Sequence, residues 1–185
     1  MLELIYETHA ATLDNETGHA TGWLPGELSE AGREQALELG ARRRGVDAVF
    51  SSDLGRALET VAIAFFDAEV PIFHDWRLRE CDYGALNGAP ADELELEKHL
   101  DVPFPGGESY RDVVARVASF LEDLRRGWDG KHVLVVSHAA PRWALQHLLD
   151  GRPLEELVGA PFDWQPGWTF TLPHDCDLLE SRSRS

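Results

Sequence analysis

The sequence predicts an α/β protein, a three-layer sandwich with a mostly parallel central sheet and helices on both faces. Short apolar segments alternate with longer segments of helical periodicity, which is the order that a parallel sheet requires. Residues 132–137 (HVLVVS) are almost wholly apolar, as expected for a central strand covered on both faces. The 185 residues fit one domain, which we place at residues 1–180, with a frayed tail at 181–185.

The first strand is predicted at residues 2–6 (LELIY), an apolar run bounded by polar residues. Residues 8–28 have no clear period and contain three glycines and a proline, so we predict a loop. Loops of this length in a small domain are usually functional. Ser29 is a predicted N-cap, and the helix that follows at 30–44 carries basic residues in its last turn, where the helix dipole favours them.

The second strand is predicted at residues 46–52 (VDAVFSS), followed by a helix at 53–66 with apolar side chains at helical spacing. Residues 70–73 (VPIF) predict a further short strand. The segment 74–90 is irregular.

The second half begins with a predicted acidic helix over residues 90–100, which the sequence FPGGE ends. Ser109 is a predicted N-cap for a long amphipathic helix. The central strand at 132–137 leads to His138, and Pro141 opens the next helix, where a missing N–H costs nothing. Residues 168–173 (WTFTLP) predict a late strand.

The composition narrows the class of partner. A net charge of −16 argues against nucleic acid, whose binding depends on lysine and arginine, and a phosphate site would have to be a basic island. No apolar run has the length of a membrane span, and the chain shows no secretory signal. Cys81 and Cys176 are too few for a disulfide framework. We therefore expect a cytoplasmic protein with no nucleic-acid or membrane partner.

Three predicted strand ends carry polar groups suited to one task. The first delivers His9; the second delivers two serines and, one turn later, Arg56; the central strand delivers His138. Ligands of open α/β sheets gather outside the carboxyl ends of the strands. Each residue also has a simpler interpretation, since histidines at strand ends and arginines on helix surfaces are common.

Five segments together make the sequence recognisable. They are residues 8–15 (THAATLDN), 21–32 (TGWLPGELSEAG), 51–60 (SSDLGRALET), 78–88 (LRECDYGALNG) and 133–145 (VLVVSHAAPRWAL). In this order they resemble the motifs of the histidine phosphatase superfamily, which includes cofactor-dependent phosphoglycerate mutase. The resemblance implies the phosphoglycerate mutase-like fold.

The resemblance also implies a mechanism. His9 would attack phosphorus as the nucleophile, while Arg56 and His138 donate to the phosphoryl oxygens. Glu80 would protonate the leaving alkoxide and then activate water. Asn15 falls on the last position of the opening motif and is carried over as a phosphate-binding residue. No metal or other cofactor is implied, because cationic side chains supply the positive charge.

The opening motif departs from the family's Arg-His-Gly-Glu. Thr8 replaces an arginine that helps to hold the phosphoryl group in relatives, and Ala10 and Ala11 replace the glycine and the acidic residue. Losing one preorganised donor typically costs about 10²–10³ in rate, which a phosphatase could survive. Arg142, in the first turn after His138, is the candidate substitute at the phosphate site, beside Thr8 itself, and Arg79 is a weaker one.

Two functions stay open. The first is a metal-independent phosphatase that hydrolyses a small phosphomonoester through a phosphohistidine on His9. The second is an inactive or weakly active relative that binds a phosphorylated ligand. We expect a mutase less than a phosphatase, because the chain lacks the length for a mutase lid. The sequence identifies neither the substrate nor the oligomeric state, and a homodimer is left open.

Overall fold

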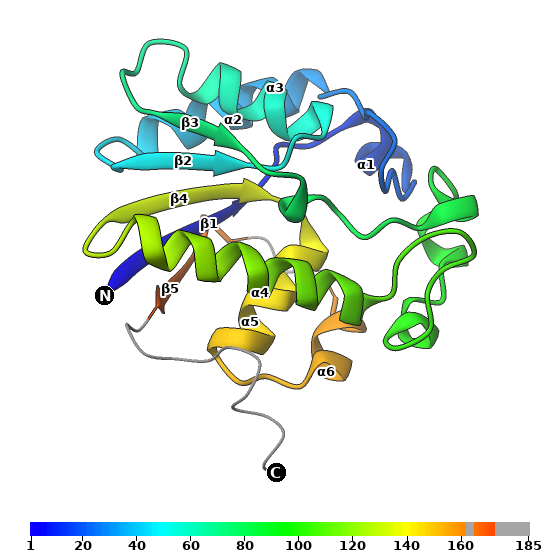
Figure 1. Ribbon diagram of the computed structural model, residues 1–185. Helices are drawn as coiled ribbons and strands as arrows, with labels where there is room; N and C mark the ends of the chain where they lie inside the picture. Colours follow the sequence, from blue (N-terminus) through cyan, green and yellow to red (C-terminus); the bar gives the residue numbers. More distant parts are fainter. Residues whose placement is uncertain (162–164, 173–185) are drawn as a thin grey trace.

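The computed structural model describes residues 1–161 and 165–172 and shows a five-stranded sheet of order β3-β2-β4-β1-β5 (Figure 1). Four strands are parallel, and β5 pairs antiparallel with β1. The strands are β1 (Leu2–Thr8), β2 (Ala48–Ser51), β3 (Ile72–His74), β4 (His132–Ser137) and β5 (Trp168–Leu172). The predicted α/β class and mostly parallel sheet are confirmed. The predicted tail at 181–185, Cys176 and the end of the last predicted strand, residue 173, lie outside the described residues.

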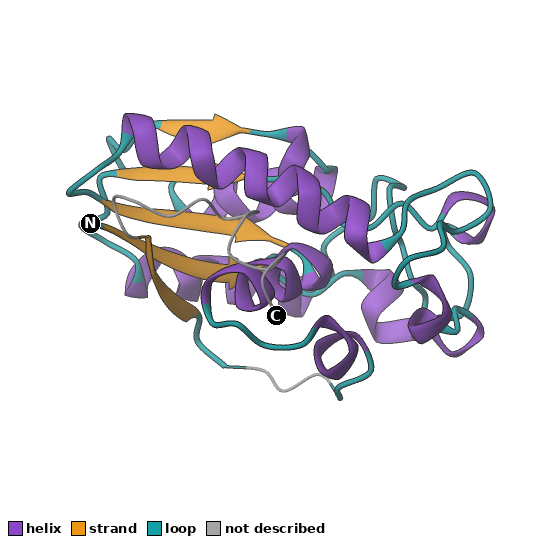
Figure 2. Ribbon diagram, turned by 60° about the horizontal axis from the view of Figure 1, so that its bottom comes forward, coloured by secondary structure: helices purple, strands orange, loops and turns teal. Residues whose placement is uncertain are grey.

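Helices cover both faces of the sheet (Figures 1 and 2). On one face, side chains of α2 and α3 pack with Val49, Leu134 and Val136. On the other, side chains of α4, α5 and α6 pack with alternate residues of β1 and β4. The helices are α1 (Leu13–Thr17), α2 (Glu30–Arg42), α3 (Gly55–Ala64), α4 (Tyr110–Gly127), α5 (Ala139–Leu149) and α6 (Leu154–Val158). This arrangement confirms the three predicted layers.

The caps that the sequence predicted are present. The Ser29 side chain accepts a hydrogen bond from the Gly32 amide at the start of α2. Ser109 begins α4 with a reciprocal capping box, in which its hydroxyl accepts from the Asp112 amide and the Asp112 carboxylate accepts from the Ser109 amide. Such contacts satisfy backbone donors that the first helical turn leaves without partners.

The predicted helix at 90–100 and the predicted loop at 8–28 are both wrong in part. The segment 90–100 contains two short 3₁₀ turns, Ala91–Glu93 and Leu96–His99, and no α-helix, because Glu95 between them adopts a left-handed conformation with φ 42°. The predicted loop 8–28 contains α1, which Thr12 caps by accepting from the Asn15 amide. The helix α6 was not predicted. In the described residues, no helix combines the length and the apolar character needed to cross a membrane.

Candidate active site

The carboxyl ends of β1 and β4 bring two histidines together. Thr8 and Ser137 are partners in the parallel register, so His9 and His138 each follow the last paired residue of a strand. The amide of His9 donates to the Ser137 carbonyl at 2.8 Å, and the two imidazole ring centroids lie 5.0 Å apart. Adjacent parallel strands thus create the juxtaposition that the sequence predicted from two separate strand ends.

The contacts of His9 fix which ring nitrogen carries the proton. Nδ1 lies 2.7 Å from the Ala10 carbonyl oxygen, which can only accept, so Nδ1 holds the N–H. The Nε of Arg56 donates to Nε2 at 3.3 Å, so Nε2 presents its lone pair. Burial, together with the positive charge of Arg56, lowers the pKa of His9 to about 3. The imidazole is therefore neutral, with Nε2 as the basic nitrogen.

Arg56 connects His9 to the loop between α1 and α2. It stands in the first turn of α3 and is 2% exposed. Its Nη1 donates to the Leu24 carbonyl at 3.1 Å and its Nη2 to the Gly22 carbonyl at 2.9 Å, while Nε faces His9. One guanidinium thus connects α3 to the loop between α1 and α2. The same group places a positive charge beside His9 Nε2.

His138 is fully buried, and neither ring nitrogen has a hydrogen-bond partner among the described residues. Its carbonyl accepts from the Tyr6 hydroxyl at 2.5 Å, which fixes the backbone at the start of α5. Burial holds the pKa of His138 well below its usual range, and the positive charge of Arg56 acts in the same direction. A buried polar group without a partner is costly, so this ring is placed for a partner that enters the cavity.

The carboxylate of Glu80 lies against the start of α5. Oε1 accepts from the amides of Cys81 at 2.8 Å and Ala140 at 3.1 Å, and Oε2 accepts from the Ala139 amide at 3.1 Å. The side chain is 8% exposed and lines the same cavity as both histidines. A carboxylate has about four acceptor positions, so three backbone donors fix its orientation and leave one position unfilled.

A cavity of about 470 Å³ connects these residues. It contains Thr8, which takes the place of the family arginine, and Asn15, whose Oδ1 accepts from the Thr12 amide and caps α1. The structure thus brings His9, Glu80 and His138 together with Thr8 and Asn15. Arg56 is not among the lining residues and reaches the cavity through its contact with His9.

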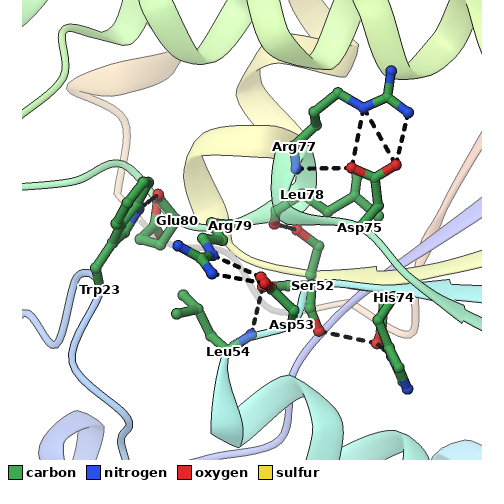
Figure 3. A network of polar contacts seen from close by, with 12 residues as sticks. Trp23, Ser52, Asp53, Leu54, His74, Asp75, Arg77, Leu78, Arg79 and Glu80 are labelled. Carbon is green, nitrogen blue, oxygen red and sulfur yellow. Dashed lines mark hydrogen bonds and ion pairs between the residues drawn. The ribbon is translucent and has the colours of Figure 1, made fainter.

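The two arginines considered as substitutes for position 8 lie elsewhere. Arg142 lines a second cavity, where its guanidinium carbon lies 4.4 Å from the ring centroid of Trp168. Arg79 makes two hydrogen bonds of 2.7 Å to the Asp53 carboxylate and stacks on Trp23 (Figure 3). Neither position favours the role of a phosphate ligand beside His9.

The sequence analysis missed the wall of the cavity that comes from α2. Gln35, Glu38, Leu39 and Arg42 share one face of that helix and line the cavity together with Glu7 of β1. Glu7 is 3% exposed, and a buried carboxylate in a strand requires a basic partner. The run of three arginines at 42–44 was the signal that could have identified that partner. The predicted basic island is instead a mixed site, because the described residues that line it include Glu7, Glu38 and Glu80 and a single arginine.

In the described part of the chain, no group of three or more histidine, cysteine, aspartate or glutamate side chains could hold a metal ion. The titratable side chains that line the cavity include His9, His138 and Glu80.

A family model described as "Histidine phosphatase superfamily (branch 1)" matches residues 8–164. Among curated proteins, a 2,3-bisphosphoglycerate-dependent phosphoglycerate mutase of Methylobacterium sp. (strain 4-46) is 34% identical, over 84% of this chain and 84% of that protein. Phosphoserine phosphatase 1 of Hydrogenobacter thermophilus is 32% identical, over 85% of this chain and 80% of that protein. The relatives therefore include both a mutase and a phosphatase.

Solved structures agree with the fold. YhfR of Bacillus stearothermophilus matches with a TM-score of 0.83 and 27% identity, covering 97% of this chain and 100% of that one. A mycobacterial glucosyl-3-phosphoglycerate phosphatase matches with a TM-score of 0.72 and 28% identity, covering 84% of this chain and 82% of that one.

Proposed function

The chain belongs to the histidine phosphatase superfamily, and from that premise we propose that it is a phosphatase that hydrolyses a small phosphomonoester through a phosphohistidine on His9. The observation that carries the proposal is the pair of neutral imidazoles at one cavity. His9 presents the lone pair of Nε2, and the buried ring of His138 has no partner among the described residues.

In the first step, His9 Nε2 attacks phosphorus and the bond to the leaving oxygen breaks. A phosphoryl oxygen that accepts the Arg56 Nε–H would release the Nε2 lone pair for this attack. The ring N–H of His138 would donate to a second phosphoryl oxygen, which satisfies the buried ring. Phosphoryl transfer requires such positioning and charge stabilisation more than covalent work by the protein.

Glu80 serves as the acid and then the base. As a carboxylic acid it gives its proton to the leaving alkoxide. The resulting carboxylate takes a proton from the water that attacks the phosphohistidine, and the P–N bond breaks to give inorganic phosphate and neutral His9. Its three backbone contacts keep the carboxyl group in one orientation through both steps.

The test compares hydrolysis of an aryl phosphate by the native protein, His9→Ala and a matched control, His132→Ala. His132 is the exposed first residue of β4, so it lies at the opposite end of that strand from His138. We expect His9→Ala to remove activity and the covalent mass of one phosphoryl group, while His132→Ala retains both. Activity that survives His9→Ala, or that a chelator abolishes, would contradict the proposal.

Thr8 favours the second candidate, a protein that binds a phosphorylated ligand without turnover, because it supplies no guanidinium. A rise in melting temperature with phosphoesters, without phosphate release or phosphohistidine, would support that function. Interconversion of phosphoglycerates faster than phosphate release would instead indicate a mutase, as the relatives' names leave open.

A further inference from the structure

Arg42 stands at the C-terminal end of α2 and lines the same cavity as Thr8, His9 and His138. It is the single lysine or arginine among the described residues that form this lining. Its side chain is 28% exposed, so the protein covers it only in part. This places a permanent positive charge in the cavity that contains the proposed nucleophile.

Glu7 holds Arg42 in that position. Its Oε1 accepts from Arg42 Nε at 3.1 Å and its Oε2 accepts from Nη2 at 2.9 Å. Arg43 adds a third hydrogen bond, from Nε to Oε1 at 2.6 Å. Two guanidinium groups share one buried carboxylate, so the cluster retains a net positive charge. The contacts to Glu7 use Nε and Nη2 of Arg42, which leaves the N–H groups of Nη1 as donors.

The other arginines near the site are committed. Arg56 uses its outer nitrogens on the backbone carbonyls of the long loop. Arg79 is paired with Asp53, and Arg142 lines the second cavity. A second guanidinium for a phosphoryl group at His9 is therefore available from α2.

The residues around His9 have short side chains, which fill little of the cavity that Arg42 and His9 both line. Thr8, Ala10 and Ala11 all line the cavity, and each is small. An arginine at position 8 would project from the end of β1 into the space that Arg42 borders. Glu38 and Glu80 also line this space, and without a cation their charges would repel a phosphate.

We propose that Arg42, oriented by Glu7, binds the phosphoryl group of the substrate and supplies the guanidinium that Thr8 lacks. The inference rests on the proposed function, because it takes the ligand at His9 to be a phosphomonoester. It adds a substrate-binding residue from α2, a helix outside the motifs that place His9, Arg56 and His138.

The test compares Arg42→Gln with Arg43→Gln, a matched control that removes the same charge from the same carboxylate but does not line the cavity. Titration calorimetry with inorganic phosphate gives affinity independently of turnover. A charge-assisted hydrogen bond corresponds to about a tenfold to hundredfold change in affinity. We expect Arg42→Gln to weaken phosphate binding by that factor and to raise KM, while Arg43→Gln changes affinity less than about threefold. Equal effects of the two variants would overturn the inference.

A second comparison uses Thr8→Arg in two backgrounds. In Arg42→Gln, the new arginine should recover at least tenfold in phosphate affinity, on the scale of one charge-assisted bond. In the native protein it should gain less, because Arg42 already supplies the charge. An equal gain in both backgrounds would show that Arg42 does not act at this position. Melting temperatures of all variants identify any that fail to fold. If Arg42→Gln does not fold, Arg42→Lys replaces it as a milder change, and we again expect weaker phosphate binding than in the native protein and in Arg43→Gln.

The two proposals fail in different ways. Absence of hydrolysis and of phosphohistidine in the native protein would contradict the proposed function. The calorimetric comparison of Arg42→Gln with Arg43→Gln would still decide whether Arg42 binds phosphate.

Discussion

The imidazole rings of His9 and His138 lie 5.0 Å apart at an interplanar angle of 55°, each one residue beyond a paired strand position. Neither ring lies near a carboxylate hydrogen-bond partner: His9 contacts the Ala10 carbonyl and Arg56, and His138 has no ring partner among the described residues. An imidazolium at either position would have no hydrogen-bonded carboxylate among the described residues. The site therefore holds two neutral rings close together, which has consequences for stability as well as for catalysis.

The first prediction concerns stability at acidic pH. The pKa of His9 is lowered from its usual 6.5 to about 3 by burial and Arg56. Between these values the unfolded chain binds a proton that the folded chain does not, so the free energy of unfolding falls as the pH falls below about 6.5. The slope is about 1.4 kcal/mol per pH unit for one proton, and the loss is complete near the folded pKa.

Urea unfolding of the native protein and of His9→Gln at about pH 7 and about pH 5 checks this, because the variant removes one proton from the linkage. We expect the native protein to lose about 2 kcal/mol more than His9→Gln over this interval. A parallel loss in both proteins would contradict the neutral, buried state of His9.

The second prediction separates the two roles of Glu80. Glu80→Gln removes the transferable proton, and we expect hydrolysis of an alkyl phosphate to slow by about 10²–10⁴. An aryl phosphate, whose leaving group needs no proton, should still phosphorylate His9, and the phosphohistidine should accumulate because water activation is lost. Rapid-quench measurement of phenol release and of covalent phosphate checks both expectations.

Equal slowing of the first turnover for alkyl and aryl substrates would contradict the assignment of Glu80 as the acid. Because three amides donate to this carboxylate, the melting temperature and the phosphate affinity of the variant distinguish a chemical effect from a displaced α5.

The third prediction concerns the close approach of α2 to the opening loop. A Cβ at Gly32 would lie 2.0 Å from the Ala11 carbonyl oxygen. Alanine is the better helix former by about 1 kcal/mol, yet overlap with backbone forces a shift that typically costs about 1–3 kcal/mol. We expect Gly32→Ala to destabilise the fold and to lower activity by moving the loop that begins at His9.

Gly127→Ala is the matched control, since a Cβ there meets no heavy atom within 4 Å at the end of α4. It should be neutral or stabilising by up to about 1 kcal/mol, with activity unchanged. Chemical denaturation of both variants provides the measurement, and the same sign of change in both would count against the packing argument.

The sequence by itself determined the strands, the caps and the order of the motifs. The apolar run at residues 132–137 predicts a buried strand, and Ser29 and Ser109 predict where helices begin. These signals can be read from the sequence because they depend on neighbours within a few residues. The position of His9 and His138 at strand ends followed in the same way. Their proximity required one further rule, that parallel strands present their carboxyl ends at one edge.

Only the tertiary structure decided which arginines face the cavity. Arg42 and Glu7 are separated by 35 residues along the chain, and an arginine is long enough to point toward any of several neighbours, so no local pattern fixes its direction. Arg142 follows His138 closely in sequence yet turns to Trp168 in a second cavity. Glu95, with φ 42°, likewise interrupts the segment 90–100, which the sequence predicted as a helix. Local periodicity encodes backbone and burial, whereas the partner of a long charged side chain depends on which elements the completed fold brings together.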